Sequence, residues 1–131
     1  MNQQWQDSYL LMELTKLRSS DKVDEAFSWF SYQFLAQDYL EFREQCPRGS
    51  PERRKFSTVC NFFELCGALV YRGNLSEDLF FEMGFGLDRA WQKMKGLIVG
   101  FRADTDPRMY ENFEWLYRRS LEWGKTNPPK F

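Results

Sequence analysis

Polar side chains occur on two segments of the sequence that are otherwise strongly apolar. Asn61 and Glu64 lie one helical turn apart on the first segment, and Asn112 and Glu114 lie among aromatic residues on the second. A polar group inside a core costs several kcal/mol unless it is paired. Structural pairing with an arginine such as Arg72, Arg89 or Arg118 is the favoured interpretation. The functional alternative is a polar pocket for a small ligand or a partner side chain, formed by Asn61, Glu64, Arg72, Asn112 and Glu114.

A second group of side chains is positively charged. The densest basic cluster lies around an expected helix start and consists of Arg48, Arg53, Arg54 and Lys55. The free N–H groups and the dipole of a helix N-terminus favour anions, so the cluster could hold a phosphate, a nucleic acid or another anionic partner. The simpler interpretation is a solvated helix start whose cations reach acidic neighbours.

The residue types that are missing exclude several kinds of chemistry. The 131 residues include no histidine, which excludes Ser-His-Asp and Cys-His catalysis and zinc sites that need imidazole. Asp104 and Asp106 are too few for a calcium loop, and Asp106 before Pro107 is explained as a helix cap. We therefore predict no metal, no cofactor and no catalytic residue. An enzyme would require a closed carboxylate pocket around Glu64 or Glu114.

Cysteine content and the start of the sequence indicate the compartment. Cys46, Cys60 and Cys66 are odd in number and form no C-x-x-C pair, which suits buried thiols in a reducing cytoplasm. The first residues are polar and do not resemble a secretory signal. Apolar runs fall far short of the ~20 residues of a membrane span. The formal charge of -1 argues against a general nucleic-acid binder. A soluble cytoplasmic protein is expected.

The sequence predicts that the elements which position these residues are helices. Apolar residues recur at three and four positions along most of the chain, and no sustained alternation typical of strands occurs. The expected helices cover about 5–17, 23–34, 51–72, 76–83, 87–102 and 107–124. The second stripe continues on a displaced line at Leu35, Tyr39 and Phe42, which predicts a break or bend near 36–38. The helix at about 51–72 is apolar nearly all round, which is typical of a central helix.

Local signals mark where these helices start and stop. Ser50 before Pro51 is a strong helix start, and Asp38 has the spacing of a capping box with Glu41. Two glycines predict a corner over 84–86. The sequence therefore predicts a compact all-α bundle, orthogonal or antiparallel, of five to seven helical segments around the central helix. It should form one domain over 1–131 with a short flexible tail at about 125–131.

Three stretches of the chain together resemble a known family. They are Asn61–Gly73 (NFFELCGALVYRG), Glu77–Phe81 (EDLFF) and Pro107–Leu116 (PRMYENFEWL), with Trp91 between the second and the third. Their order and spacing are similar to those of domain-of-unknown-function family 4760, short helical bacterial proteins, from about Leu11 to Arg118. The resemblance implies a fold but no activity and no catalytic residues. Some relatives place a membrane-spanning segment ahead of this region, and we expect this chain to lack one.

The aromatic content suggests a surface for association. The chain holds 13 Phe, 5 Trp and 6 Tyr residues, more than a helical core of this size needs. Trp5, Trp123 and Phe131 lie near the ends, where burial within one domain is hardest, so we expect self-association or docking of a protein partner. The sequence thus predicts a non-enzymatic protein-interaction or regulatory module. The alternative is a nucleic-acid or phosphate-binding protein that uses the basic cluster.

Overall fold

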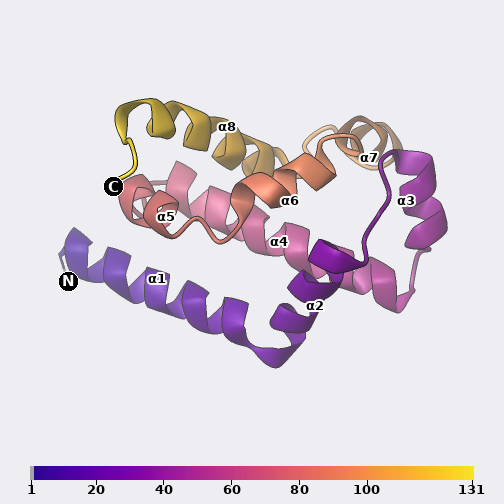
Figure 1. Ribbon diagram of the computed structural model, residues 1–131, viewed down its shortest axis with the longest axis horizontal. Coiled ribbons are helices and arrows are strands. Elements are labelled where there is room, and N and C mark those ends of the chain that lie inside the picture. Colours follow the sequence, from indigo (N-terminus) through magenta and orange to yellow (C-terminus); the bar gives the residue numbers. More distant parts are fainter. Residues whose placement is uncertain (1) are drawn as a thin grey trace.

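The computed structural model describes residues 2–131, and every regular element in that range is an α-helix (Figure 1). The eight helices are α1 (Gln3–Ser19), α2 (Asp21–Tyr32), α3 (Tyr39–Gln45), α4 (Pro51–Tyr71), α5 (Glu77–Met83), α6 (Leu87–Met94), α7 (Ile98–Asp104) and α8 (Glu111–Thr126). The predicted all-α class is confirmed, with one segment more than the five to seven expected.

Helix α4 is the central element, as its sequence indicates. In Figure 1 it runs diagonally through the middle of the molecule, and its main packing partners are α8 and α2. Its core contacts are largely aromatic. Phe56 stacks on Phe101 with ring centres 5.6 Å apart, and Phe63 stacks on Phe113 at 5.0 Å. The buried residues of α4 are Phe56, Val59, Cys60, Phe62, Phe63, Cys66, Gly67 and Val70.

Helix ends with local signals form as expected. The Ser50 side chain accepts a hydrogen bond from the Arg53 N–H at 3.1 Å and starts α4. Asp38 accepts from the Glu41 N–H at 2.8 Å and starts α3. The corner after α5 forms where Gly84, Phe85 and Gly86 all have positive φ. A short polar side chain caps backbone groups two or three residues away, and a glycine adopts positive φ without steric cost. These helix ends therefore follow from the local sequence.

The predicted helix over 87–102 is divided into α6 and α7. The break covers 95–97. A Cβ atom added at Gly96 would lie 2.4 Å from the carbonyl oxygen of Gln37, so the chain here passes directly over the backbone of the segment before α3. Glycine is also the weakest helix former apart from proline. A contact with a remote segment therefore interrupts a stripe that is continuous in the sequence.

Helix α8 begins later than its cap-and-proline signal predicts. Asp106 accepts from the Arg108 N–H at 2.7 Å and holds a turn, and α8 starts only at Glu111. Tyr110 precedes it with φ +57° and supplies no side-chain cap. At its other end α8 continues to Thr126, beyond the expected end near Gly124.

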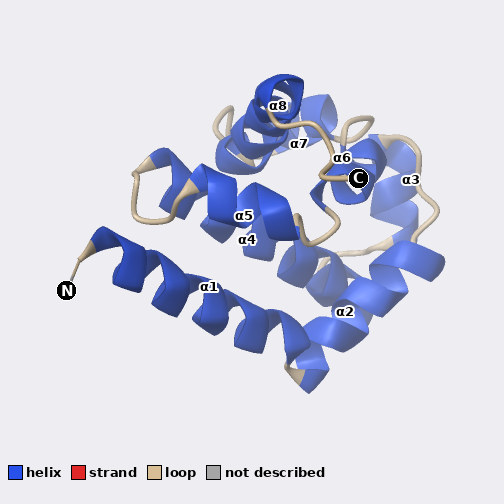
Figure 2. Ribbon diagram, turned by 60° about the vertical axis from the view of Figure 1, so that its left-hand side comes forward, coloured by secondary structure: helices blue, strands red, loops and turns tan. Residues whose placement is uncertain are grey.

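The connection between α1 and α2 is held by a side-chain hydrogen bond to the end of α1. The Ser20 hydroxyl donates to the carbonyl of Leu17 at 2.7 Å, at the end of α1, and does not cap α2. Figure 2 shows α1 along one side of the molecule, joined to α2 through a tight turn. Of its residues only Asp7 and Leu14 are buried.

Over residues 2–131, no helix combines sufficient length with sufficient apolar character to cross a bilayer.

Candidate functional site

Glu64, the first carboxylate of the predicted polar pocket, holds the start of another helix. It accepts hydrogen bonds from the backbone N–H groups of Phe113 at 2.9 Å and Asn112 at 3.4 Å. These are first-turn groups of α8, which lack partners inside the helix. Because Tyr110 supplies no cap, Glu64 on α4 takes that role. The favoured interpretation pairs some of these polar groups with arginines, but the partners of Glu64 are backbone groups.

Glu114 is paired with two arginines. Arg102 donates to one carboxylate oxygen at 2.8 Å, and Arg118 donates to the other at 2.8 Å. Burial raises the pKa of Glu114, but the hydrogen bonds and charges of Arg118 and Arg102 outweigh it and leave the pKa below its usual value. Pairing with Arg118 was expected. Arg102 was missed because it stands twelve residues away, beyond the reach of helical spacing.

The remaining residues of the predicted polar pocket do not converge. Asn61 is exposed on α4, and Arg72 is exposed at its C-terminal cap. Arg72 and Asn112 do line one surface cavity of about 540 Å³, beside Trp115 and Arg108. The five residues thus occupy several places, and the two carboxylates serve in structural contacts.

The cations of the basic cluster each have an intramolecular partner. Arg48 lies 3.9 Å from Asp104, and Lys55 lies 3.6 Å from Glu25. Arg53 donates to the Cys46 carbonyl at 2.9 Å, and Arg54 donates to the Gly49 carbonyl at 2.8 Å. Arg53 also lies over the Phe42 ring, 4.6 Å from its centre. Two members of the cluster therefore hold the loop before α4, which supports the structural interpretation of those two.

The three cysteines are free and buried, as expected. Burial raises the pKa of Cys46 to about 11 and that of Cys66 to about 12, and it also raises the pKa of Cys60 well above its usual value. Thiols of this kind are poor nucleophiles, because the thiolate is the reactive form.

The acidic stretch before α8 is engaged in protein contacts. The Tyr39 hydroxyl donates to Asp104 at 2.6 Å, and this hydrogen bond is the main cause that lowers the pKa of the Asp104 carboxyl. Asp106 holds the turn described above. No group of three or more metal-ligating side chains occurs within the part of the chain that the structure describes.

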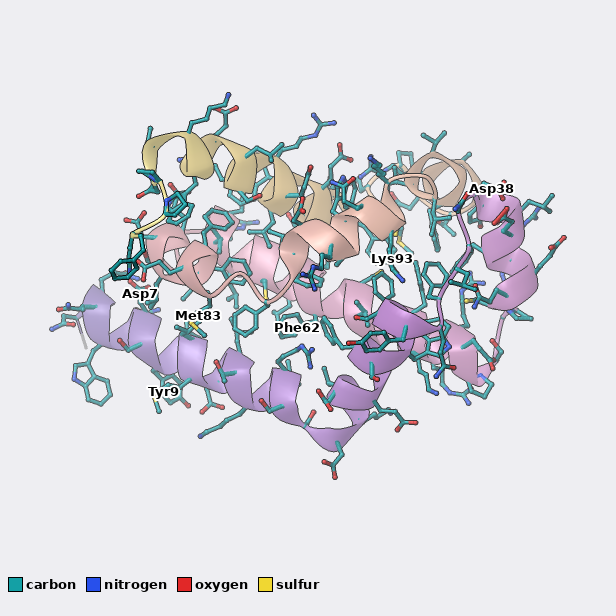
Figure 3. All side chains as sticks on the ribbon, in the orientation of Figure 1. Asp7, Tyr9, Asp38, Phe62, Met83 and Lys93 are labelled. Carbon is teal, nitrogen blue, oxygen red and sulfur yellow. The ribbon has the colours of Figure 1, made fainter. Side chains whose placement is uncertain are left out.

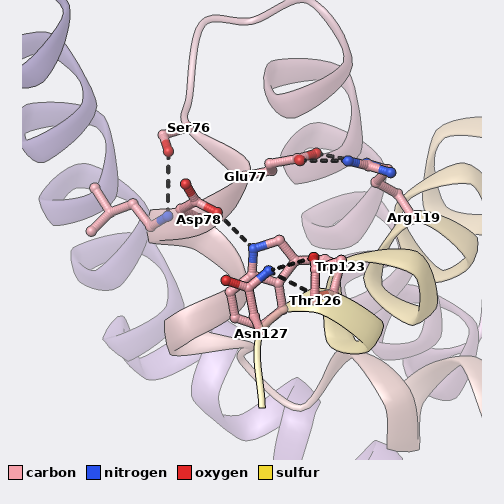
Figure 4. Close-up of polar contacts among 8 residues, drawn as sticks. Ser76, Glu77, Asp78, Arg119, Trp123, Thr126 and Asn127 are labelled. Atoms are coloured by element: carbon pink, nitrogen blue, oxygen red, sulfur yellow. Dashed lines mark hydrogen bonds and ion pairs between the residues drawn. The ribbon is translucent and has the colours of Figure 1, made fainter. Parts of the chain in front are cut away.

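Polar contacts join α5 to α8 near the end of the chain (Figure 4). Arg119 donates two hydrogen bonds to Glu77, at 2.8 and 2.6 Å, and they lower the pKa of Glu77. The Trp123 indole N–H donates to Asp78 at 2.7 Å. Trp123 is therefore half-buried, whereas the Phe131 side chain is exposed.

The clearest unpartnered surface lies on α1. Trp5, Tyr9 and Met12 form a row along the helix and remain 64 %, 51 % and 61 % exposed. Figure 3 shows Tyr9 on the side of α1 that faces away from the other helices. We call this surface the α1 outer face. It consists of Asn2, Gln4, Trp5, Ser8, Tyr9 and Met12, which line a shallow depression of about 510 Å³.

A buried carboxylate determines which side of α1 faces out. Asp7 is 8 % exposed and accepts hydrogen bonds from the Ser76 N–H at 3.2 Å and from the Gln3 side chain at 2.8 Å. Ser76 starts α5, so Asp7 fastens the inner side of α1 to that helix. It is the only charged residue among residues 2–12. The α1 outer face therefore carries no charge of its own. Sequence reasoning missed Asp7, because its partner is 69 positions away.

Comparison with known proteins identifies a family. The family model described as "Domain of unknown function (DUF4760)" matches residues 6–120, which is most of the chain. Neither a curated protein nor a solved structure matches the sequence.

Proposed function

The chain belongs to the DUF4760 family, and from this starting point we propose that it is a non-enzymatic protein-interaction module that pairs with a second copy of itself through the α1 outer face. The observation that carries the proposal is the exposed row of Trp5, Tyr9 and Met12. This stretch of helix has one charged residue, Asp7, and that residue is buried. Tryptophan, tyrosine and methionine are enriched in protein interfaces, and charged residues are depleted in their centres.

The row is suited to an antiparallel pair of α1 helices. A twofold axis near residues 8 and 9 places Trp5 against the partner's Met12 and brings the two Tyr9 side chains close together. Such an interface is self-complementary, and contact of a thioether with an aromatic ring is favourable. Because residues 2–12 expose no charged side chain, the two copies bring no like charges together. Their helix dipoles also run in opposite directions.

The available area supports a weak dimer. An aromatic side chain contributes about 150–250 Å² when fully buried, so at the observed exposures the row offers roughly 300–400 Å² in each copy. Two copies bury roughly 600–800 Å² through this row, to which the polar rim adds, and the row alone lies below the ~1,200 Å² at the lower end of specific interfaces. We therefore expect a concentration-dependent dimer with micromolar or weaker affinity.

Sedimentation velocity over a wide concentration range tests the proposal. The mass should rise from monomer towards dimer with concentration, and Trp5→Gln should raise the dissociation constant about tenfold or more, a cost of about 1.4 kcal/mol. Leu121→Gln is the matched control, because Leu121 is also a half-exposed apolar residue on a long helix. This control should dimerise as the wild type does.

Two outcomes would overturn the proposal. One is a strict monomer at high concentration, and the other is a Trp5→Gln variant that dimerises like the wild type. Salt provides a further criterion, because apolar docking barely responds to it, whereas contacts with phosphates weaken steeply between about 50 and 200 mM salt.

The cytoplasm is the compartment that we propose for this module. The support is that Cys46, Cys60 and Cys66 are all free thiols, which a reducing compartment maintains. The absence of enzymatic activity also remains a proposal. It is supported by Glu64 and Glu114, whose oxygens are used in helix capping and in ion pairs.

A further inference from the structure

A groove on another part of the surface has an unusual charge. It lies between the end of α1, α2 and the start of α6, and it encloses about 380 Å³. Three cations, Arg18, Arg89 and Lys93, contribute to its lining, and no carboxylate does. We call it the α2–α6 groove. The protein has a nearly balanced total charge, so an excess of cations in one groove is a local feature.

Lys93 contributes positive charge to the groove, but all three N–H groups of its ammonium are already used in hydrogen bonds. Its ammonium group donates to the carbonyls of Phe30, Ser31 and Phe34 at 2.7, 3.1 and 2.9 Å. The Phe30 and Ser31 carbonyls belong to the C-terminal end of α2, which carries partial negative charge, and Phe34 follows that end. Figure 3 shows Lys93 between α6 and α2. Lys93 thus offsets the negative end of α2, which would otherwise repel an anion from the groove.

The two arginines retain donors for a ligand. Arg18 donates to Asp24 at 3.1 Å and lies over the Phe27 ring, 3.7 Å from its centre, which leaves other N–H groups of its guanidinium available. The Arg89 guanidinium forms no hydrogen bond or ion pair with any residue over 2–131. A guanidinium group offers paired N–H donors that match the oxygens of a carboxylate or a phosphate.

Apolar side chains also line the groove. Phe27, Phe30, Phe85 and Ala90 contribute to its floor and walls. Phe85 has φ +53°, a left-handed backbone conformation that a residue with a side chain rarely adopts. Its ring packs against the core ring of Phe62 at 5.6 Å, which holds it at this wall. A simple inorganic ion would use the arginines and leave these apolar walls uncovered.

We propose that the α2–α6 groove binds small organic anions with an aromatic body, the anionic group contacting Arg18 and Arg89 and the ring covering the apolar walls. The volume fits, since small-molecule sites enclose about 300–1,000 Å³. Carboxylates and phosphate monoesters share the chemistry that this site recognises. The inference goes beyond the proposed dimerisation and uses a different surface.

Titration of ¹⁵N-labelled protein, followed by NMR, tests the site. The probes are 1-naphthoate, 1-naphthyl phosphate, the neutral 1-naphthamide and inorganic phosphate. We expect both naphthyl anions to shift the amide signals of Gly86 and Ala90, and the tighter of the two identifies the preferred anionic group. Neutral naphthamide and inorganic phosphate should each bind at least tenfold more weakly. Equal binding of the neutral probe, equal binding of inorganic phosphate, or no shift at these amides would overturn the proposal.

Two substitutions locate the binding. Arg89→Gln should weaken binding of the better anion about tenfold, because Arg89 has no other contact to lose. Arg43→Gln, which removes another exposed arginine, should leave binding unchanged. An Arg89→Gln variant with wild-type affinity contradicts the site. Aromatic probes can also bind to the α1 outer face, so the titration is repeated with the Trp5→Gln variant. Unchanged affinity for the better anion in this variant shows that the groove binds the anion independently of the proposed dimer interface.

Discussion

At the scale of single residues, two carboxylates hold helix starts on other elements. Glu64 accepts from the first-turn N–H groups of α8, and Asp7 accepts from the Ser76 N–H where α5 begins. Ordinary N-caps act on groups two or three residues away. Here the acceptor comes from 48 and 69 positions away, so each contact also joins two helices. Loss of either carboxylate should therefore weaken both a helix start and a packing contact.

Removal of the Glu64 carboxylate tests the capping role. We expect Glu64→Ala to lower the free energy of unfolding by about 1–2 kcal/mol, because it leaves N–H groups at the start of α8 without a partner. Glu64→Gln keeps an acceptor oxygen and should cost less. Urea denaturation monitored by circular dichroism measures both. Asn61→Ala is the control one turn earlier on the same helix, where the side chain is exposed, and it should have little effect. Equal losses for Asn61→Ala and Glu64→Ala would refute the role.

At the scale of helices, the crossing of α4 and α8 depends on a glycine. A Cβ atom added at Gly67 would lie 2.3 Å from the carbonyl oxygen of Asn112, closer than any real contact. The backbone of α8 therefore rests directly on α4 at this point. The same approach brings the Asn112 and Phe113 N–H groups within reach of Glu64, so the crossing and the cap depend on each other.

Adding a methyl group at the crossing should separate the two helices. We expect Gly67→Ala to lower the free energy of unfolding by about 1–3 kcal/mol, because the obstructing atom belongs to backbone and cannot rotate away. Gly124→Ala is the matched control within α8. No atom lies within 4 Å of its added Cβ, and it should raise stability by about 0.5–1 kcal/mol because alanine favours helix. Thermal and urea unfolding of both variants give the comparison, and the same sign for both changes would contradict the packing argument.

At the scale of the whole molecule, burial is distributed unevenly. Eight residues of α4 are buried, whereas the 17-residue α1 buries only Asp7 and Leu14. Stability within a protein follows local burial, and segments with few buried contacts open without global unfolding. The helix that carries the proposed docking surface is thus held by far fewer buried residues than the central helix.

Hydrogen exchange should show this difference directly. We expect amide protons of α1 to exchange at much lower opening free energies than those of α4, which should exchange only through global unfolding. Mass spectrometry of peptides that cover each helix measures the two rates at a protein concentration low enough to keep the chain monomeric. Asp7→Asn should accelerate exchange in α1 and leave α4 nearly unchanged. Equal protection of α1 and α4 in the wild type would be inconsistent with loose attachment.

Sequence alone determined the helical class, the central position of the helix at about 51–72, and the helix ends marked by Ser50, Asp38 and the glycine corner at 84–86. These features depend on apolar spacing along one helix or on a side chain that reaches nearby backbone. Contacts with remote segments account for the break over 95–97, the late start of α8 and the partners of Glu64, and spacing along the chain does not reveal such contacts.

The two apolar rows of α1 illustrate the same division. Spacing alone predicts one row with Trp5, Tyr9 and Met12 and a neighbouring row with Leu10, Leu14 and Leu17. In the folded protein Leu14 is buried and the first row faces outward. Periodicity identifies the faces of a helix but carries no information about what covers each of them. That choice was made by the surfaces of α2 and α5 on which α1 packs, together with the hydrogen bond from the Ser76 N–H to Asp7.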